Sequence, residues 1–426
     1  MLAVFLISLF ATLLIGTPIA FSLLTSGSLM MLAKDVFDVR VVAQQMLGGF
    51  NGFTLLAMPF FVLAGEAMNK GGISEAIVKA VMAVFGRIRG ALGYVVIFSC
   101  MIFAGLSGSA IADAACLGGI LIPLMLKNNY SRGRATGLLV SSAIMANIIP
   151  PSIGFILFCL ASGASVTKMF MGGIVPGVIF ALTLSIAWFF VARKDNMQAR
   201  QDKLPPKEIA GEIFRALPAL ILPLFIIIGL RGGFFTPTEA GAVAAAYAII
   251  CGMFIYKRIK FKDLFEMFGA TVETTARVTV IVAASLLVSW IMTVSQLSAT
   301  LVNSFSFLVE HPVLLMLACQ VLFLLMGMVM ETSSIIMIMV PIILPLVKAA
   351  GISVEYFGVV MIINLTFGML TPPVGTVLYV GMGISKASMA ETIKGAAPFM
   401  LLEILLIILF SVFPEIITVP MAFITR

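Results

Sequence analysis

The chain has 426 residues, of which 61% are hydrophobic and only 11% are charged. Apolar runs of about 20 residues, the length that a helix needs to cross a bilayer, recur along the whole sequence. The composition therefore predicts an all-α polytopic membrane protein, and it excludes a soluble catalytic or solute-capturing domain within these residues.

Residue types exclude further function classes. The formal net charge is +7, and the basic residues cluster in short connections between apolar runs, as the positive-inside rule predicts, so no nucleic acid is expected as a partner. The single histidine and five scattered cysteines lack metal-ligand spacing, and the GxxxxGK[ST] phosphate-binding pattern is absent. The sequence thus predicts neither an ATPase nor a metalloenzyme, and membrane lipid is the expected surrounding.

The first half of the chain, residues 1–192, is predicted to fold into spans, one hairpin and one broken helix. In chain order these are two short spans at 2–16 and 18–33, a span at 46–68, an amphipathic stretch at 74–89, a re-entrant hairpin at 91–126, a broken helix at 135–163 and a final span at 168–192. The hairpin is too long for one crossing and has a polar, glycine-containing turn at its midpoint. The break falls at Pro150-Pro151, because proline removes a helix donor and clashes with the preceding turn.

The second half, residues 216–412, repeats this order. Its Pro-Pro pair is Pro372-Pro373, and 372 − 150 = 222; Gly105 and Gly327 keep the same spacing. The repeat places a hairpin at 312–348 and a broken helix at 354–384, with a cytoplasmic linker at 193–215 before it and a C-terminal tail at 413–426 after it. Together the halves predict ten crossings and two hairpins.

The charges that flank the two hairpins differ. Arg87, Arg89 and Lys127 flank the first hairpin, which should therefore open to the cytoplasm, whereas the nearly neutral flanks of the second favour the periplasm. The halves are then an inverted repeat. Unwound backbone at membrane depth survives only where protein, an ion or a water-filled cavity satisfies it, so the repeated break predicts a transporter binding site.

Polar residues gather at the two predicted hairpin tips and at the two breaks. Half-helix N-termini there would direct amides at an anion, and unwound carbonyls would meet a cation. Hydroxyls and carbonyls suit a hard monovalent cation such as Na⁺, while Asp113 or Glu331 offers an alternative route for protons. The candidates are Ser107, Gly108, Ser109, Asp113, Asn147, Pro150, Pro151 and Ser152 in the first half, and Gly327, Glu331, Thr332, Ser333, Gly368, Thr371, Pro372, Pro373 and Thr376 in the second.

Each of these residues also has a purely structural interpretation. Ser and Thr in membrane helices often bond back to their own backbone, and glycines in spans are usually packing devices. Their joint placement at tips and breaks in both halves favours a binding site. Glu66, Glu239 and Glu403 lie nearer the predicted span ends, where a carboxylate can reach the membrane surface.

Four motifs resemble one known family. GLSGSAIADAA at 105–115, ANIIPPS at 146–152, GMVMETSS at 327–334 and FGMLTPPVG at 367–375 are similar to the large membrane subunit of tripartite ATP-independent periplasmic (TRAP) transporters. The resemblance covers essentially the whole chain. It implies a Na⁺-coupled, elevator-type importer of the ion-transporter superfamily in the bacterial inner membrane. It also implies two partners, a small four-helix membrane subunit and a periplasmic substrate-binding protein.

The resemblance also implies roles for particular residues. One Na⁺ site would use Ser107, Ser109, Asn147 and Pro150, and the other would use Gly327, Thr332, Thr371 and Pro372. The organic substrate would lie between these sites, against Ser107, Ser152 and Glu331. Many members of the family carry Asp where this chain has Glu331, which keeps the charge and changes the substrate geometry.

The expected substrate is an organic acid. Its hydroxyl or amide donors would meet Glu331, while its carboxylate would take the helix amides. The chain looks similar to the sialic acid branch of the family, so N-acetylneuraminate is named first. A C4-dicarboxylate substrate and a self-sufficient carrier that needs no binding protein are the open alternatives.

Overall fold

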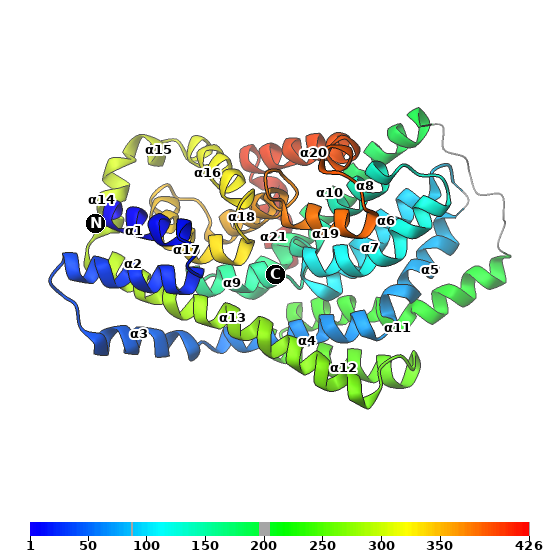
Figure 1. Ribbon diagram of the computed structural model, residues 1–426, viewed down its shortest axis with the longest axis horizontal. Coiled ribbons are helices and arrows are strands. Elements are labelled where there is room, and N and C mark those ends of the chain that lie inside the picture. Colours follow the sequence, from blue (N-terminus) through cyan, green and yellow to red (C-terminus); the bar gives the residue numbers. More distant parts are fainter. Residues whose placement is uncertain (87, 196–204, 426) are drawn as a thin grey trace.

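The computed structural model describes residues 1–86, 88–195 and 205–425, which form helices and no strands (Figure 1). The first half contains α1 (Leu2–Leu14), α2 (Ile19–Ala33), α3 (Val39–Phe50), α4 (Ala57–Lys70), α5 (Ile73–Phe85), α6 (Ala91–Ser107), α7 (Ala110–Lys127), α8 (Arg132–Ala143), α9 (Ile153–Ser162) and α10 (Val166–Lys194). The second contains α11 (Pro206–Arg231), α12 (Pro237–Ile250), α13 (Phe261–Val294), α14 (Leu297–Ser304), α15 (Ser306–Glu310), α16 (Pro312–Gly327), α17 (Thr332–Ala349), α18 (Val354–Gly368), α19 (Thr376–Ser385), α20 (Met389–Val412) and α21 (Glu415–Ile424). The predicted all-α fold class is confirmed.

Helices α6–α10 recur as α16–α20. The second helix of each tip pair begins at Ala110 or at Thr332, and 332 − 110 = 222, the spacing of the Pro-Pro pairs. Both Pro-Pro peptide bonds are cis, and each lies in a non-helical gap, between α8 and α9 or between α18 and α19. The sequence repeat is therefore also a structural repeat.

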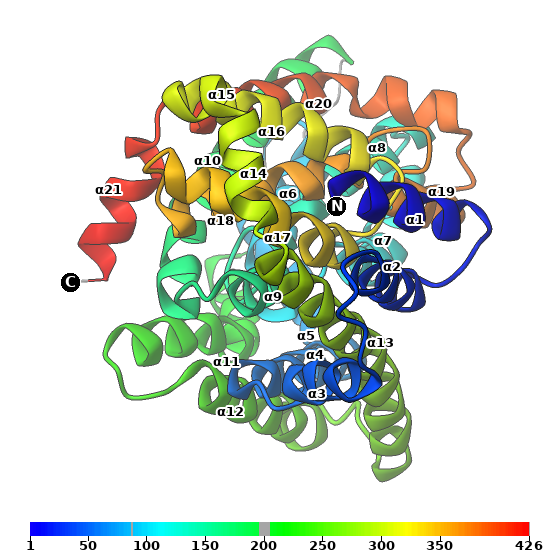
Figure 2. The same ribbon diagram turned by 90° about the vertical axis from the view of Figure 1, so that its left-hand side faces the viewer.

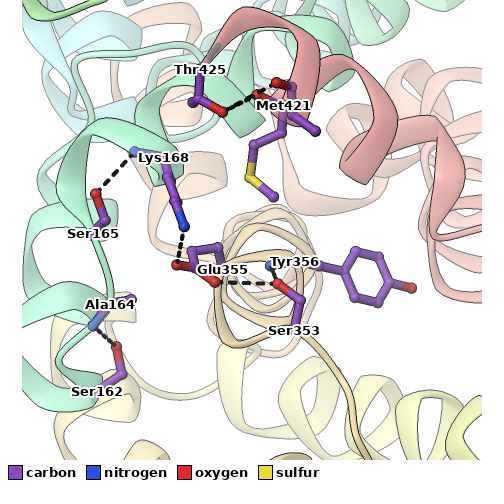
Figure 3. A network of polar contacts seen from close by, with 10 residues as sticks. Ser162, Ala164, Ser165, Lys168, Ser353, Glu355, Tyr356, Met421 and Thr425 are labelled. Atoms are coloured by element: carbon purple, nitrogen blue, oxygen red, sulfur yellow. Dashed lines mark hydrogen bonds and ion pairs between the residues drawn. The ribbon is translucent and has the colours of Figure 1, made fainter.

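The two broken helices run in opposite directions, from α8 to α9 leftwards and from α18 to α19 rightwards in Figure 1. The start of α8 packs on the start of α20, where Arg134 Nη1 donates to the carbonyl of Gly395 at 2.9 Å. At the start of α18, Glu355 instead lies 3.8 Å from Lys168 Nζ of α10 (Figure 3). At one end, α8 of the first half therefore pairs with α20 of the second half. At the other end, α18 of the second half pairs with α10 of the first. This exchange is the arrangement of an inverted repeat.

The remaining helices pack largely on one another, as Figure 2 shows for α3, α4, α11, α12 and α13 along one side of the molecule. In this group α12 packs on α4, and α13 packs on α2 and α3. The group meets α6–α10 and α16–α20 through α13, which contacts α17, and through α5, which packs on both α11 and α6. Helices α6–α10 and α16–α20 therefore share a long interface with the helices that surround them.

Three predicted segments contain helices that the sequence does not indicate. The span expected at 46–68 is instead two helices, α3 and α4, that bend by 52° at the break between them. The 193–215 linker is helical at both ends, because α10 runs to Lys194 and α11 begins at Pro206, a residue suited to a first helical turn. The 413–426 tail contains α21, which packs on α10. Residues 196–204 of the linker, together with Arg87 and Arg426, lie outside the described residues.

Seven helices within the described ranges are individually long and apolar enough to cross a membrane, or eight if the bent pair α3 and α4 counts as one crossing. The seven include α7 and α17, the second arms of the predicted hairpins, and omit the broken helices, whose segments are short. The chain is therefore a multi-pass membrane protein, and the number of ten crossings stays a prediction.

Candidate functional site

The first hairpin tip is built around Gly108. The residue ends α6 with φ +64°, in the left-handed region that favours glycine, and a Cβ there would lie 2.6 Å from the carbonyl oxygen of Pro151. Its own carbonyl accepts a hydrogen bond from the Ile153 amide at 3.4 Å. Ser109 then begins α7 by accepting a bond from the Ala112 amide. The tip of the hairpin therefore sits directly on the first Pro-Pro break.

Asn147 connects the tip to both halves of the molecule. Its Oδ1 accepts a hydrogen bond from the Ala110 amide at 3.2 Å, at the start of α7. Its Nδ2 donates to Thr366 Oγ1 of α18 at 3.3 Å, and its backbone carbonyl accepts from Ser152 Oγ at 2.7 Å. The hydrogen bonds of this one residue thus fix the first tip, the first break and the second broken helix relative to one another.

A buried carboxyl lies next to this tip. Asp113, in the first turn of α7, is fully buried and accepts a hydrogen bond from Ser107 Oγ through one oxygen. Its other oxygen has no partner. Ser107 Oγ in turn accepts from the Ser109 amide at 3.3 Å. A buried acceptor without a donor suits a bound cation or a proton.

The second tip also touches its own break. Gly327 at the end of α16 lies against Gly368 so closely that a Cβ on Gly368 would come within 2.6 Å of the Gly327 Cα. The Met328 carbonyl accepts from the amides of Val374 and Gly375, just past Pro373. Backbone hydrogen bonds thus connect the second break to its hairpin, as they connect the first break to the first hairpin.

Some of the hydroxyls around the second break already have hydrogen-bond partners within the protein. Thr332 Oγ1 lies 3.2 Å from the sulfur of Met369, and Thr371 Oγ1 donates back to the Phe367 carbonyl at 3.0 Å. Thr376, at the start of α19, has a buried hydroxyl oxygen without a partner. Of these threonines, Thr376 is therefore the one with a free buried donor and acceptor.

A polar cavity of about 100 Å³ lies between the two tips. It is lined by residues of both halves and of two surrounding helices: Met58, Gly108, Ser109, Ala110, Ile111, Asn147, Ile153, Gly154, Thr274, Val278, Glu331, Thr332, Ser333 and Met369. Residues at the starts of α7, α9 and α17 are among them. The positive ends of three helices therefore converge on one cavity, which favours a negatively charged ligand.

The predicted residues divide into two groups. Gly108, Ser109, Asn147, Glu331, Thr332 and Ser333 line the cavity. Ser107, Asp113, Pro150, Pro151, Ser152, Gly327, Gly368, Thr371, Pro372, Pro373 and Thr376 are not among its lining residues. Ser152 is fully buried, and its hydroxyl is used to bond Asn147 and to begin α9. Ser152 thus supports Asn147 from outside the cavity lining, and its contact with substrate stays a prediction.

The sequence analysis misses the contribution of α13. Thr274 lines the cavity, and Arg277, one turn further along, acts electrostatically on the Glu331 carboxylate while it pairs with Glu273. The signal was present, since Glu273 and Arg277 are charged residues inside a long apolar segment, where ionisable groups are expected to be functional. Arg277 lies outside the cavity lining, and its charge acts on Glu331 from the same helix as Thr274.

The donors around the two tips fit a hard cation. They are hydroxyls, backbone carbonyls, the Asn147 amide oxygen and the Asp113 carboxyl, and none is a thiolate or imidazole. Asp113 and Thr376 each have a buried oxygen without a hydrogen-bond partner, which is the kind of atom that a cation coordinates. The residues present are therefore compatible with Na⁺ at both tips.

Comparison with known proteins gives consistent matches along the chain. The family described as "Tripartite ATP-independent periplasmic transporter, DctM component" matches residues 6–416. The 2,3-diketo-L-gulonate TRAP transporter large permease protein YiaN of Escherichia coli is 42% identical over 99% of both chains. The sialic acid TRAP transporter large permease protein SiaM of Vibrio cholerae is 34% identical over 94% of this chain and 93% of its own length.

Two further comparisons bear on substrate and fold. The C4-dicarboxylate TRAP transporter large permease protein DctM of Vibrio cholerae is 34% identical over 95% of this chain and 94% of its own. Among solved structures, the YdaH transporter of Alcanivorax borkumensis matches with a TM-score of 0.65 at 16% identity, over 92% of this chain and 91% of the other. At that identity the match supports the fold alone.

Proposed function

The chain belongs to the DctM family of tripartite ATP-independent periplasmic transporters, and from this premise we propose that it is the transport subunit of a Na⁺-coupled importer of a sugar acid. Its partners are a small membrane subunit and a periplasmic binding protein, and its location is the bacterial inner membrane. The observation that carries the proposal is the cavity between the two hairpin tips, which Glu331 lines together with residues from the starts of three helices.

The cavity has the chemistry that a hydroxylated acid needs. The partial positive charge at the starts of α7, α9 and α17 attracts the acid's carboxylate. The Glu331 carboxylate accepts bonds from hydroxyl groups of the same molecule, and Ser109 and Thr332 complete the polar surface. A dicarboxylate would place a second negative charge near Glu331, which disfavours it.

The relatives refine the substrate. The relative named for 2,3-diketo-L-gulonate is 42% identical, whereas those named for sialic acid and C4-dicarboxylates are each 34% identical. We therefore place a keto sugar acid such as 2,3-diketo-L-gulonate before the N-acetylneuraminate that the sequence analysis names first. Both are polyhydroxylated monocarboxylates, so the assigned role of Glu331 is the same for either.

Na⁺ would supply the coupling. Ser107, Ser109, Asn147 and Pro150 would hold the first ion, with the Asp113 carboxyl bonded to Ser107 beside them. Gly327, Thr332, Thr371 and Pro372 would hold the second, and Thr376 offers a further buried hydroxyl. Cations there would neutralise buried oxygens behind the cavity and order both tips before the acid binds. Because the tips belong to α6–α10 and α16–α20, those helices would carry the acid across the membrane as one body against α2–α4 and α11–α13, which is an elevator movement.

Uptake of three labelled acids tests the substrate. Proteoliposomes hold the chain with its small subunit, its cognate binding protein is added outside, and an inward Na⁺ gradient is imposed. We expect 2,3-diketo-L-gulonate to enter faster than N-acetylneuraminate, and succinate to enter at the background rate. Rapid succinate uptake would contradict the sugar-acid proposal while leaving the family mechanism in place.

A further inference from the structure

An ion pair on α13 is exposed at the depth of the cavity. Arg277 pairs with Glu273 one turn before it, and 75% and 64% of these two side chains are exposed. Thr274 and Val278, from the same turns of the helix, line the cavity between the hairpin tips. The pair therefore lies level with the expected binding site, at the middle of a 34-residue helix. Hydrocarbon is a poor solvent for charges at that depth, so this surface needs a different environment.

The charged surface continues from this pair to the start of α13. Four charged residues follow one another at intervals of four, seven and four positions: Lys262, Glu266, Glu273 and Arg277. At about 100° of rotation per residue these positions fall within about 60° of one another, and Ala270 lies about 20° beside them. Lys262 and Glu266 are exposed as well. We call these five residues the charged stripe of α13.

A second exposed stripe on α13 is apolar. It consists of Phe261, Phe265, Phe268 and Val272. By the same rotation these residues lie about 90–150° from the middle of the charged stripe. Phe265 is 76% exposed and Val272 is 65% exposed, as much as the charged residues beside them. Because lipid tails accept apolar side chains and not charged ones, the apolar stripe suits lipid and the charged stripe suits water.

The charged stripe lies between the apolar stripe and the cavity. Thr274 is about 60° further round the helix than Arg277, on the side away from the apolar stripe, and it lines the cavity with Val278. The charge of Arg277 also acts on Glu331, another lining residue. The exposed polar surface of α13 is therefore continuous with the polar surface of the cavity. This continuity favours water over a partner protein as the neighbour of the charged stripe.

The ion pairs of the charged stripe make it compatible with an anion. Glu266 pairs with Lys70 of α4, and Glu273 pairs with Arg277, so neither carboxylate is a free negative charge. An exposed pair at i and i+4 contributes little free energy, so Arg277 can leave Glu273 for another carboxylate at small cost. We propose that the charged stripe lines a water-filled path between one membrane surface and the cavity, and that Arg277 meets the organic anion at the inner end. This inference rests on the proposed function.

Labelling of introduced cysteines tests the path. Ala270→Cys places a thiol on the charged stripe without removing a charge, and Val272→Cys is the matched control on the apolar stripe. Glu273→Cys is a second probe, whose native side chain is as exposed as that of Val272. The sample is the chain with its small subunit in proteoliposomes, with a charged methanethiosulfonate reagent on both sides of the membrane. Peptide mass spectrometry follows each new thiol, and the unsubstituted chain gives the background of its own five cysteines.

The labelling rates distinguish water from lipid and from protein. We expect the thiols of Ala270→Cys and Glu273→Cys to react at least about tenfold faster than that of Val272→Cys, because only a thiol in water forms the reactive thiolate. Equal rates for all three variants would overturn the path. Labelling of the stripe variants only when the small subunit is left out would also overturn it, since protein would then cover the charged stripe.

Uptake of the labelled acid tests the role of Arg277. Arg277→Gln removes the charge and should raise KM roughly fivefold, whereas Arg277→Lys keeps the charge and should restore most of the affinity. An unchanged KM in Arg277→Gln, or no recovery in Arg277→Lys, would contradict the contact with the anion. If the unsubstituted complex takes up no organic acid, the proposed function fails, while the labelling rates still decide whether the charged stripe faces water.

Discussion

Gly108 is the residue at which the first hairpin meets the first Pro-Pro break, and its φ of +64° allows that contact. In Gly108→Ala the new Cβ would meet the Pro151 carbonyl oxygen at 2.6 Å, and the left-handed backbone alone costs about 1–3 kcal/mol. We expect a lower unfolding midpoint in detergent. Gly119→Ala on α7 is the matched control, because nothing lies within 4 Å of its Cβ, and it should be neutral or stabilising by about 1 kcal/mol.

Glu331 is the residue that distinguishes a hydroxylated acid from other anions in this account. Glu331→Gln keeps the size and removes the charge, which should cost about 1.5–3 kcal/mol of hydrogen bonding to the substrate and raise KM for uptake roughly 10- to 100-fold. Glu310→Gln on α15 should leave KM unchanged. An unaltered KM in Glu331→Gln would show that the carboxylate does not bind the substrate.

The sequence could predict the role of a residue only where that residue stands inside a recognisable motif. Gly108, Ser109, Asn147, Glu331 and Thr332 stand in tip and break motifs and do line the cavity. Thr274 comes from α13, a helix outside both motifs, so only the packed structure brings it there. The burial of Glu403 likewise depends on which stripe of α20 faces the protein interior.

At the scale of helices, α8 and α20 pack with their backbones almost in contact. A Cβ on Gly395 would lie 1.8 Å from the Gly133 carbonyl oxygen, a distance that only separation of the helices could relieve. Gly395→Ala should therefore lower the unfolding midpoint by more than Gly108→Ala does. Gly383→Ala on α19, which has nothing within 4 Å, is the control. A midpoint equal to that of the control would show that the two helices are further apart than described.

The local sequence predicts the presence of helices and breaks more closely than it predicts the residues at which helices begin and end. The Pro-Pro pairs and the serine caps at Ser109, Ser152 and Ser353 mark breaks and starts that the structure retains. The bend between α3 and α4 has no proline to mark it, because Pro59 lies inside the first turn of α4. The start of α11 at Pro206 does not follow from hydropathy, because the first turns of the helix are as polar as the linker before them.

At the scale of the molecule, the two halves complete each other. Asn147 of the first half bonds Thr366 of the second, and the cavity is lined by both tips. The repeat at 222 residues predicts this pairing, because two inverted copies bring their breaks to the same depth. The helices that surround the core, and the angle at which α13 crosses it, depend on tertiary packing and do not follow from the repeat.

The central claim is that this chain moves an organic acid only as part of a three-component, Na⁺-driven system. The most direct measurement is the initial rate of acid uptake into proteoliposomes that contain the chain and its small subunit. The binding protein is added or left out, and the Na⁺ gradient is imposed or collapsed. The account predicts uptake only when the binding protein and an inward Na⁺ gradient are both present, and uptake without the binding protein, or at the same rate without the gradient, would contradict it.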